Sequence, residues 1–151
     1  MRQAHDFVVT PKDQLVIATS GNRNWPGLLR LWDRKSGEFL GSFAPGDELG
    51  NATGLALGPD GLLYVADYRD HRVVRYDLTK LERIDTFISA EQGVFHPVSV
   101  EFTASGLLYL IDDRGIVRYD SEGRLIDVLI PAGRGPLSRP RSMAFVDPEL
   151  Q

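Results

Sequence analysis

Apolar residues recur along the chain in segments of four to six residues, and several of these segments alternate with polar residues. Alternation is clear in residues 55–57 and 98–102, where every second residue is apolar. Glycine-containing turn dipeptides, such as Asp60-Gly61 and Ser105-Gly106, separate the segments. This pattern predicts short antiparallel strands joined by hairpins.

One window, residues 78–91, places apolar residues at helical spacing. The equivalent windows elsewhere in the chain, 34–43 and 121–129, contain central glycines and are typical of a turn followed by a strand. A helix in one copy would break the register of the others, so we expect a strand in residues 78–91.

The segments form an internal repeat with a period of about 44 residues. Residues 54–77 align with residues 100–120, and a more divergent copy spans residues 7–43. A further copy starts at Ser142. Four short strands per unit at this period are typical of a β-propeller blade, whose two faces are buried only by neighbouring blades.

The sequence therefore predicts an all-β fold. We expect a partial β-propeller of three four-stranded antiparallel blades plus the first strand of a fourth. The whole chain, residues 1–151, forms a single propeller segment in this interpretation. Its units are residues 5–44, 52–88 and 97–130, and the fourth starts in residues 139–151.

The unit formed by residues 54–67 and 71–77 resembles the NHL-type repeat, which is found in six-bladed propellers, and the chain is similar to bacterial proteins built from tandem units of this kind. Three units and one strand do not close a ring. The alternatives are a piece of a longer protein, which the stop inside a motif favours, a pair of chains that forms a six-bladed ring, or an open arc. The partner that closes the ring is accordingly the rest of the propeller or a second copy of the chain.

The composition is that of a globular protein with a net charge of -4, which argues against nucleic-acid binding through charge alone. There is no cysteine, and no apolar run is long enough to span a membrane. The first six residues lack the apolar core of a secretory signal, and the compartment stays undecided.

Function is expected on the rim that carries the longer, more varied loops, since variable loops on a rigid scaffold usually hold binding residues. The candidate ligand-binding residues on this rim are Trp25, Arg69, His71, His96, Arg114 and Arg139. Arginine offers a planar fork for carboxylates and phosphates. The competing interpretation is that the arginines are ordinary surface residues, and that each histidine only braces a turn next to a strand.

Aspartates recur at two repeat positions. Asp67 and Asp112 end the second strand of their units, and we expect them to accept backbone N–H groups of the following turn rather than to bind a metal. Asp33, Asp77 and Asp120 follow the third strand and are expected in tight turns.

No catalytic motif is present in the local sequence. The main hypothesis is a non-catalytic module that binds a protein or a small ligand through the loop-rich rim, with no catalytic residue, metal site or cofactor. The alternative, implied by a resemblance to propeller lyases and lactonases such as virginiamycin B lyase and gluconolactonase, is an enzyme fragment that uses a divalent metal such as calcium. RNA binding, as in some NHL propellers, is a third alternative.

Overall fold

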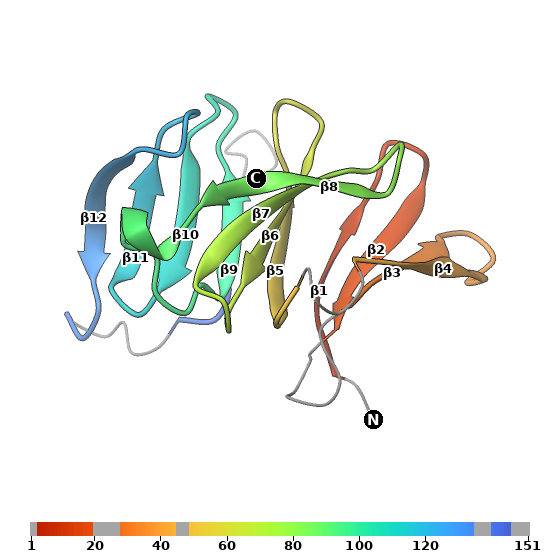
Figure 1. The fold of residues 1–151 in the computed structure, drawn as a ribbon, viewed down its shortest axis with the longest axis horizontal. Coiled ribbons are helices and arrows are strands. Elements are labelled where there is room, and N and C mark those ends of the chain that lie inside the picture. Colours follow the sequence, from red (N-terminus) through yellow and green to blue (C-terminus); the bar gives the residue numbers. More distant parts are fainter. Residues whose placement is uncertain (1–2, 20–27, 45–48, 135–139, 146–151) are drawn as a thin grey trace, which may run out of the picture.

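The computed structural model describes residues 3–19, 28–44, 49–134 and 140–145. Twelve strands are described, and they form three four-stranded antiparallel sheets in which each strand pairs with its neighbour in the sequence (Figure 1). A 3₁₀ turn at Ala90–Gln92 is the only helical element in the described residues. None of the described helices is long and apolar enough to cross a membrane.

The sheets correspond to the three expected blades. The first contains β1 (Ala4–Val9), β2 (Gln14–Thr19), β3 (Leu28–Asp33) and β4 (Phe39–Phe43). The second contains β5 (Ala52–Leu57), β6 (Leu63–Asp67), β7 (Arg72–Asp77) and β8 (Glu82–Ile88). The third contains β9 (Ser99–Phe102), β10 (Leu108–Asp112), β11 (Gly115–Tyr119) and β12 (Leu125–Pro131). The helical spacing of residues 78–91 is thus misleading, and the expected strand there is confirmed as β8.

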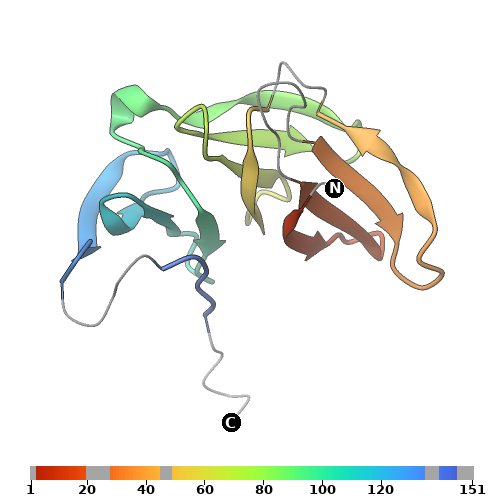
Figure 2. The same cartoon turned by 90° about the horizontal axis from the view of Figure 1, so that it is seen from below.

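The sheets fan out in an arc, as Figure 2 shows, with β1, β5 and β9 on the inner side and β4, β8 and β12 on the outer side. The inner strands contact one another, β1 against β5 and β5 against β9. Gly54 permits the second of these approaches, because a Cβ atom there would lie 2.8 Å from the Cα of Ser99. Separate sheets arranged side by side around their inner strands confirm the propeller architecture.

Two apolar clusters fill the spaces between sheets. The first cluster lies between the first and second sheets and contains Leu29 of the first sheet together with Leu55, Leu63 and Tyr76 of the second. On its other face the second sheet packs against the third, in a cluster that includes Leu108. Full burial of a leucine side chain contributes about 2 kcal/mol, so the blades stabilise one another chiefly through these clusters.

Tight turns on the opposite rim follow the recurring aspartates. In the second sheet, Asp77 Oδ1 accepts hydrogen bonds from the backbone N–H of Thr79 (2.7 Å) and from its hydroxyl (2.6 Å). These bonds hold the pKa of Asp77 below its ordinary value. Asp33 and Asp120 accept equivalent backbone bonds in their own turns, which confirms the turn assignment.

Residues 140–145 form no strand in the described part of the chain. They nevertheless lie where the first strand of a fourth blade is expected. The ring of Phe145 contacts that of Tyr109 edge-on at 4.9 Å between centroids, as Phe102 contacts Tyr64 at 4.7 Å between the second and third sheets. The described residues contain no second strand for this segment to pair with, which accounts for its lack of regular structure.

Candidate functional site

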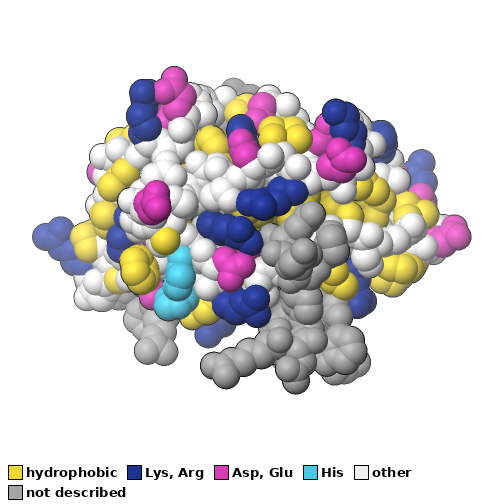
Figure 3. All heavy atoms as spheres, viewed as in Figure 1, with side chains coloured by type: hydrophobic (Ala, Val, Ile, Leu, Met, Phe, Trp, Pro, Cys, Tyr) yellow, Lys and Arg dark blue, Asp and Glu magenta, His cyan; other side chains and the backbone are white. Residues whose placement is uncertain are grey.

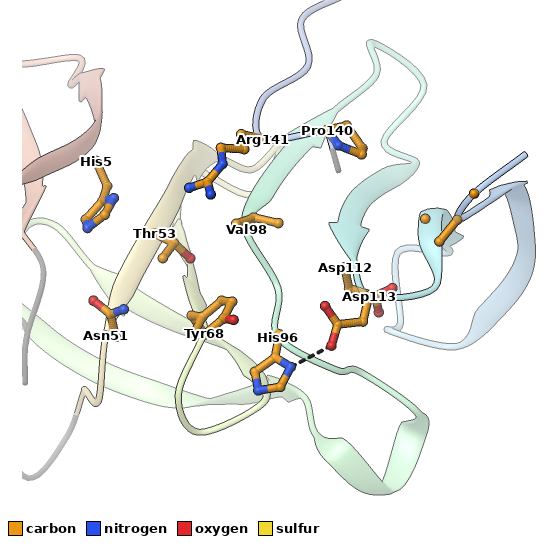
Figure 4. A pocket seen from close by; sticks show the side chains of 13 residues that line it. His5, Asn51, Thr53, Tyr68, His96, Val98, Asp112, Asp113, Pro140 and Arg141 are labelled. Carbon is orange, nitrogen blue, oxygen red and sulfur yellow. Dashed lines mark hydrogen bonds and ion pairs between the residues drawn. The ribbon is translucent and has the colours of Figure 1, made fainter. Parts of the chain in front are cut away.

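A pocket of about 890 Å³ opens on the loop-rich rim, where the inner strands begin and the loops after β6 and β10 meet them (Figure 4). All three sheets contribute to it. Its polar lining residues are His5, Asn51, Thr53, Tyr68, His96, Asp112, Asp113 and Arg141. Two buried aspartates at the ends of the second strands hold the walls of this pocket in place.

Asp67 ends β6 and is fully buried. Its carboxylate accepts hydrogen bonds from the backbone N–H groups of Gly50 (3.0 Å) and Asn51 (2.8 Å), and from Nε of Arg72 (3.1 Å). It therefore fixes the segment that leads into β5, which carries Asn51 and Thr53 to the pocket. Asp67 thus accepts backbone N–H groups, as expected, but they belong to the segment before β5 and not to the turn after β6 that the sequence predicted.

Asp112 does the same at the end of β10. It accepts a hydrogen bond from the backbone N–H of Arg114 (2.8 Å) and further bonds from Nε and Nη2 of the same residue, and it lies 3.4 Å from the backbone nitrogen of Phe95. Arg114 also donates from Nη2 to the Tyr119 hydroxyl at 2.7 Å. The expected turn role is confirmed for Asp112, and the guanidinium of Arg114 is already bonded to two partners inside the protein.

The two candidate histidines, which are far apart in the sequence, come together on this rim. The backbone N–H of His96 donates to Nδ1 of His71 at 3.0 Å, and the two rings meet at 4.3 Å between centroids. Both residues have positive φ values, 51° for His71 and 46° for His96. Such values are uncommon outside glycine, and they are often found where the surrounding structure holds a functional conformation.

His96 contacts two other side chains of the pocket lining, the carboxylate of Asp113 and the ring of Tyr68. Its Nδ1 lies 2.6 Å from Oδ2 of Asp113, and its ring stacks on Tyr68 with centroids 4.6 Å apart. Figure 4 shows the three side chains side by side along one wall. Because Nδ1 faces the carboxylate, Nε2 is the ring nitrogen that remains for a further partner. A carboxylate on Nδ1 favours the tautomer whose Nε2 can accept a proton.

Three rim arginines, Arg69, Arg72 and Arg114, are paired with aspartates. Arg69 lies 3.5 Å from Asp70, and Arg72 reaches Asp70 at 3.1 Å. On the face seen in Figure 3, Lys and Arg side chains stand beside Asp and Glu side chains, so no single-sign patch forms there. Trp25 and Arg139, the other two candidates from the sequence, lie outside the described residues.

Sequence reasoning missed Tyr68, Asp113 and Arg141. Tyr68 and Asp113 directly follow Asp67 and Asp112, so they occupy the same repeat position. In both units the buried aspartate at the end of the second strand places the residue that follows it on the pocket wall. An alignment of the repeats could have identified Tyr68 and Asp113, because they occupy one repeat position next to a recurring aspartate and yet differ in chemistry.

Residues 49–76 match the family model described as the NHL repeat. No curated protein matches the chain. Among solved structures, one assigned as a gluconolactonase is 20% identical, with a TM-score of 0.72 over 97% of this chain and 52% of the other. A catalytically inactive virginiamycin B lyase from Staphylococcus aureus, solved with quinupristin, is 14% identical, with a TM-score of 0.67 over 92% and 44%. Regucalcin from Agrobacterium tumefaciens, described as calcium-binding, is 19% identical, with a TM-score of 0.61 over 82% and 44%.

These similarities define the chain as a β-propeller segment. More particularly, it is a segment with an NHL-type repeat in its second blade, as the sequence indicated. It spans about half the length of the gluconolactonase-like structure. At these identities the solved structures show the fold alone.

Proposed function

We propose that the rim pocket binds a small polar ligand, and that recognition through this pocket is the function of the propeller segment. The observation that carries the proposal is the group formed by Tyr68, His96 and Asp113 inside a pocket of about 890 Å³. A volume of this size is typical of small-molecule sites. Tyr68 and His96 offer flat ring surfaces, and His96 Nε2 offers a hydrogen-bond acceptor to a hydroxyl group.

A binding titration tests this proposal. Gluconate is a suitable probe, because it carries both hydroxyl groups and a carboxylate and undergoes no hydrolysis. We expect gluconate to shift the ring signals of Tyr68 and His96 in NMR spectra, with saturation, and we expect Tyr68→Ala to weaken binding at least tenfold. The control is Tyr109→Phe, outside the pocket. A linear, non-saturating response, or equal binding by Tyr68→Ala, would contradict a site at this wall.

An enzymatic function is the second candidate, and the contact between His96 and Asp113 favours it. A histidine oriented by a carboxylate is the usual arrangement of a general base, which takes a proton from water or from a substrate C–H or O–H group. In this alternative Asp113 is a positioning residue and His96 Nε2 accepts the proton. Gluconolactonase-like and lyase-like propellers share the fold, which supports testing lactone hydrolysis first.

The assay for this alternative is hydrolysis of glucono-1,5-lactone, measured against the spontaneous rate. We expect His96→Gln to abolish any catalysed rate, and Asp113→Asn to lower kcat with little change in KM. A catalysed rate that His96→Gln leaves intact would exclude His96 as the base. Binding of gluconate without any catalysed hydrolysis would favour the non-catalytic proposal.

The description of the regucalcin neighbour suggests a calcium ion, but the described residues contain no group of side chains arranged to bind one. No group of three or more His, Asp and Glu side chains there is arranged to hold a metal. Asp112, the buried carboxylate nearest the pocket, has its oxygens engaged by Arg114. The paired arginines of the rim likewise give no support to RNA binding.

A further inference from the structure

One position of the repeat contributes a side chain to the rim pocket in the first two sheets. It is the second residue of the innermost strand, His5 in β1 and Thr53 in β5. The pairing with the next strand shifts register at each of these residues, which marks a β-bulge. A bulge turns a side chain out of the regular alternation of a strand and is frequent beside binding sites. The bulge thus presents His5 and Thr53 to the pocket, which both residues line.

The third and fourth copies of the repeat use the same position. Val98 precedes the residue of β9 that pairs like Gly54 of β5, and so corresponds to Thr53. Arg141 follows a proline and precedes a serine, as Val98 does. Both residues line the pocket, and Figure 4 shows all four side chains around it. One repeat position, with a different residue in each copy, therefore determines much of the chemistry of the pocket.

Two of these four side chains are basic, and neither has a partner in the described part of the chain. No hydrogen bond or ion pair there engages the side chain of His5 or Arg141. Asp6, the residue after His5, is not part of the pocket lining, and its carboxylate accepts hydrogen bonds from two backbone N–H groups. The other two side chains offer less, because Val98 is apolar and the Thr53 hydroxyl donates to a backbone carbonyl at 2.8 Å.

The carboxylates that line the pocket are engaged by other bases and do not pair with Arg141. Asp112 accepts a bond from Nη2 of Arg114 at 2.7 Å, and Asp113 lies 2.6 Å from Nδ1 of His96. In Figure 4 the guanidinium of Arg141 lies on one side of the pocket and the pair of His96 and Asp113 on the other. The pocket therefore has a basic side without a counter-charge among the described residues, opposite the wall with the stacked rings.

We propose that the pocket binds an anionic ligand, a small polyhydroxy compound with a carboxylate or phosphate group, and that Arg141 binds this group with His5 beside it. A planar guanidinium can donate two parallel N–H bonds to such a group. The hydroxyl groups of the ligand then extend toward Tyr68 and His96. This assignment rests on the function proposed for the pocket, and it adds the charge of the ligand and its orientation.

Three probes with similar polyhydroxy chains test the charge of the ligand. Gluconate carries a carboxylate, glucitol 6-phosphate carries a phosphate, and glucitol carries neither. We expect at least one of the two anions to bind about tenfold more tightly than glucitol in calorimetric titrations, because a hydrogen bond to a charged group contributes about that factor. The tighter anion identifies the group that Arg141 binds. The preference should shrink as salt is added, since exposed charges are screened.

The variant Arg141→Gln tests the residue. Arg141 is exposed and has no internal partner in the described structure, so this variant should fold as the wild type does. We expect it to bind the anions no more tightly than glucitol, with unchanged affinity for glucitol. The matched control Arg124→Gln removes the same charge from a turn of the opposite rim, where Arg124 pairs with Asp120, and should keep the preference. Tyr68→Ala, in contrast, should weaken the binding of all three probes.

The outcomes separate this proposal from the one on which it rests. Equal, saturable binding of gluconate, glucitol 6-phosphate and glucitol would refute the anion site and leave the pocket as a binding site for neutral compounds. A preference for anions that survives in Arg141→Gln would exclude Arg141 as the residue that binds the anionic group. If none of the three probes binds with saturation, the proposed function of the pocket fails, and the anion site fails with it.

Discussion

The backbone N–H of His96 donates a hydrogen bond to Nδ1 of His71, and this bond joins the loop after β6 to the segment that leads into β9. The sequence predicted that His71 would brace its own turn. The ring instead braces the loop of the next blade, and it does so as an acceptor, which requires an unprotonated Nδ1. The bond fixes the backbone of His96 and, through it, the position of the imidazole against Asp113.

Substituting His71 by phenylalanine removes the acceptor while keeping an aromatic ring beside Phe95. We expect the free energy of unfolding to fall by about 1 kcal/mol, because the His96 N–H loses its partner. Urea denaturation measures the loss, and hydrogen exchange at the His96 amide should be faster. His5→Phe, which alters another histidine of the same rim, is the control and should leave both measurements unchanged. Equal stability of His71→Phe and wild type would show that the bond contributes nothing.

The two tyrosines that the repeat places on blade faces should respond differently to truncation. Tyr76 is fully buried between the first two sheets, where its ring meets Phe43 edge-on at 5.9 Å. We expect Tyr76→Ala to cost about 3 kcal/mol through the cavity that it leaves. Tyr109 is half-buried on the free face of the third sheet, against Phe145 alone among the described aromatic rings, so Tyr109→Ala should cost less in the monomer. Chemical denaturation of both variants checks this order.

Repeat periodicity made the blades predictable, because a sheet whose two faces are both apolar has to stack on copies of itself. The same repeat identified β8 as a strand against its helical spacing, since long-range pairing with β7 outweighs local periodicity. It also assigned the turn aspartates and the bond from the Arg114 backbone to Asp112, because these contacts depend on the backbone next to each aspartate. The donors to Asp67 were not predicted, because Gly50 and Asn51 lie 17 and 16 residues away.

The pocket was less predictable, because its residues come from different blades. His96 meets His71 across 25 residues and Asp113 across 17, and no local spacing encodes either contact. Arg114 was expected to serve a ligand, yet its bonds to Asp112 and Tyr119 already occupy it. Whether it also contacts a ligand stays a prediction. Sequence alone identified the rim, while the partners of each side chain depended on how the blades pack.

Replacing Asp67 by asparagine tests how far a buried carboxylate supports the pocket wall. Its two oxygens accept from two backbone N–H groups, and the neutral amide has only one acceptor oxygen. One backbone N–H would then lose its acceptor, and Arg72 would lose its bond to residue 67 while keeping the one to Asp70, so we expect a loss of about 3 kcal/mol in unfolding free energy. Gluconate binding should weaken as well, since Asn51 is held by this contact. Asp77→Asn, in an exposed turn, is the matched control and should change stability much less.

The ion pair between Arg75 and Asp85 predicts a specific dependence of stability on pH. Arg75 donates from Nε (2.8 Å) and Nη2 (2.5 Å) to the two oxygens of Asp85, and its guanidinium lies 4.9 Å from the ring centroid of Phe87. The hydrogen bonds from Arg75 hold the pKa of Asp85 below its ordinary value. The stabilisation is therefore fully present above the unfolded-state pKa of about 3.9, and it is lost as the pH falls from there through the lower folded-state pKa.

Asp85→Asn should accordingly lower the unfolding free energy at pH 7 by less than about 1 kcal/mol, because the pair is partly exposed and screened by solvent. The difference between variant and wild type should shrink as the pH drops below 4, since the wild-type carboxyl then takes up a proton. Urea denaturation between pH 2.5 and 7, which spans roughly the window set by the ordinary carboxyl pKa, measures this convergence. The matched variant Asp127→Asn removes the equivalent partner of Arg118 in the third blade and should show a change of the same sign. A difference between Asp85→Asn and wild type that is independent of pH would mean that packing around Arg75, rather than the charge of Asp85, stabilises this edge of the second blade.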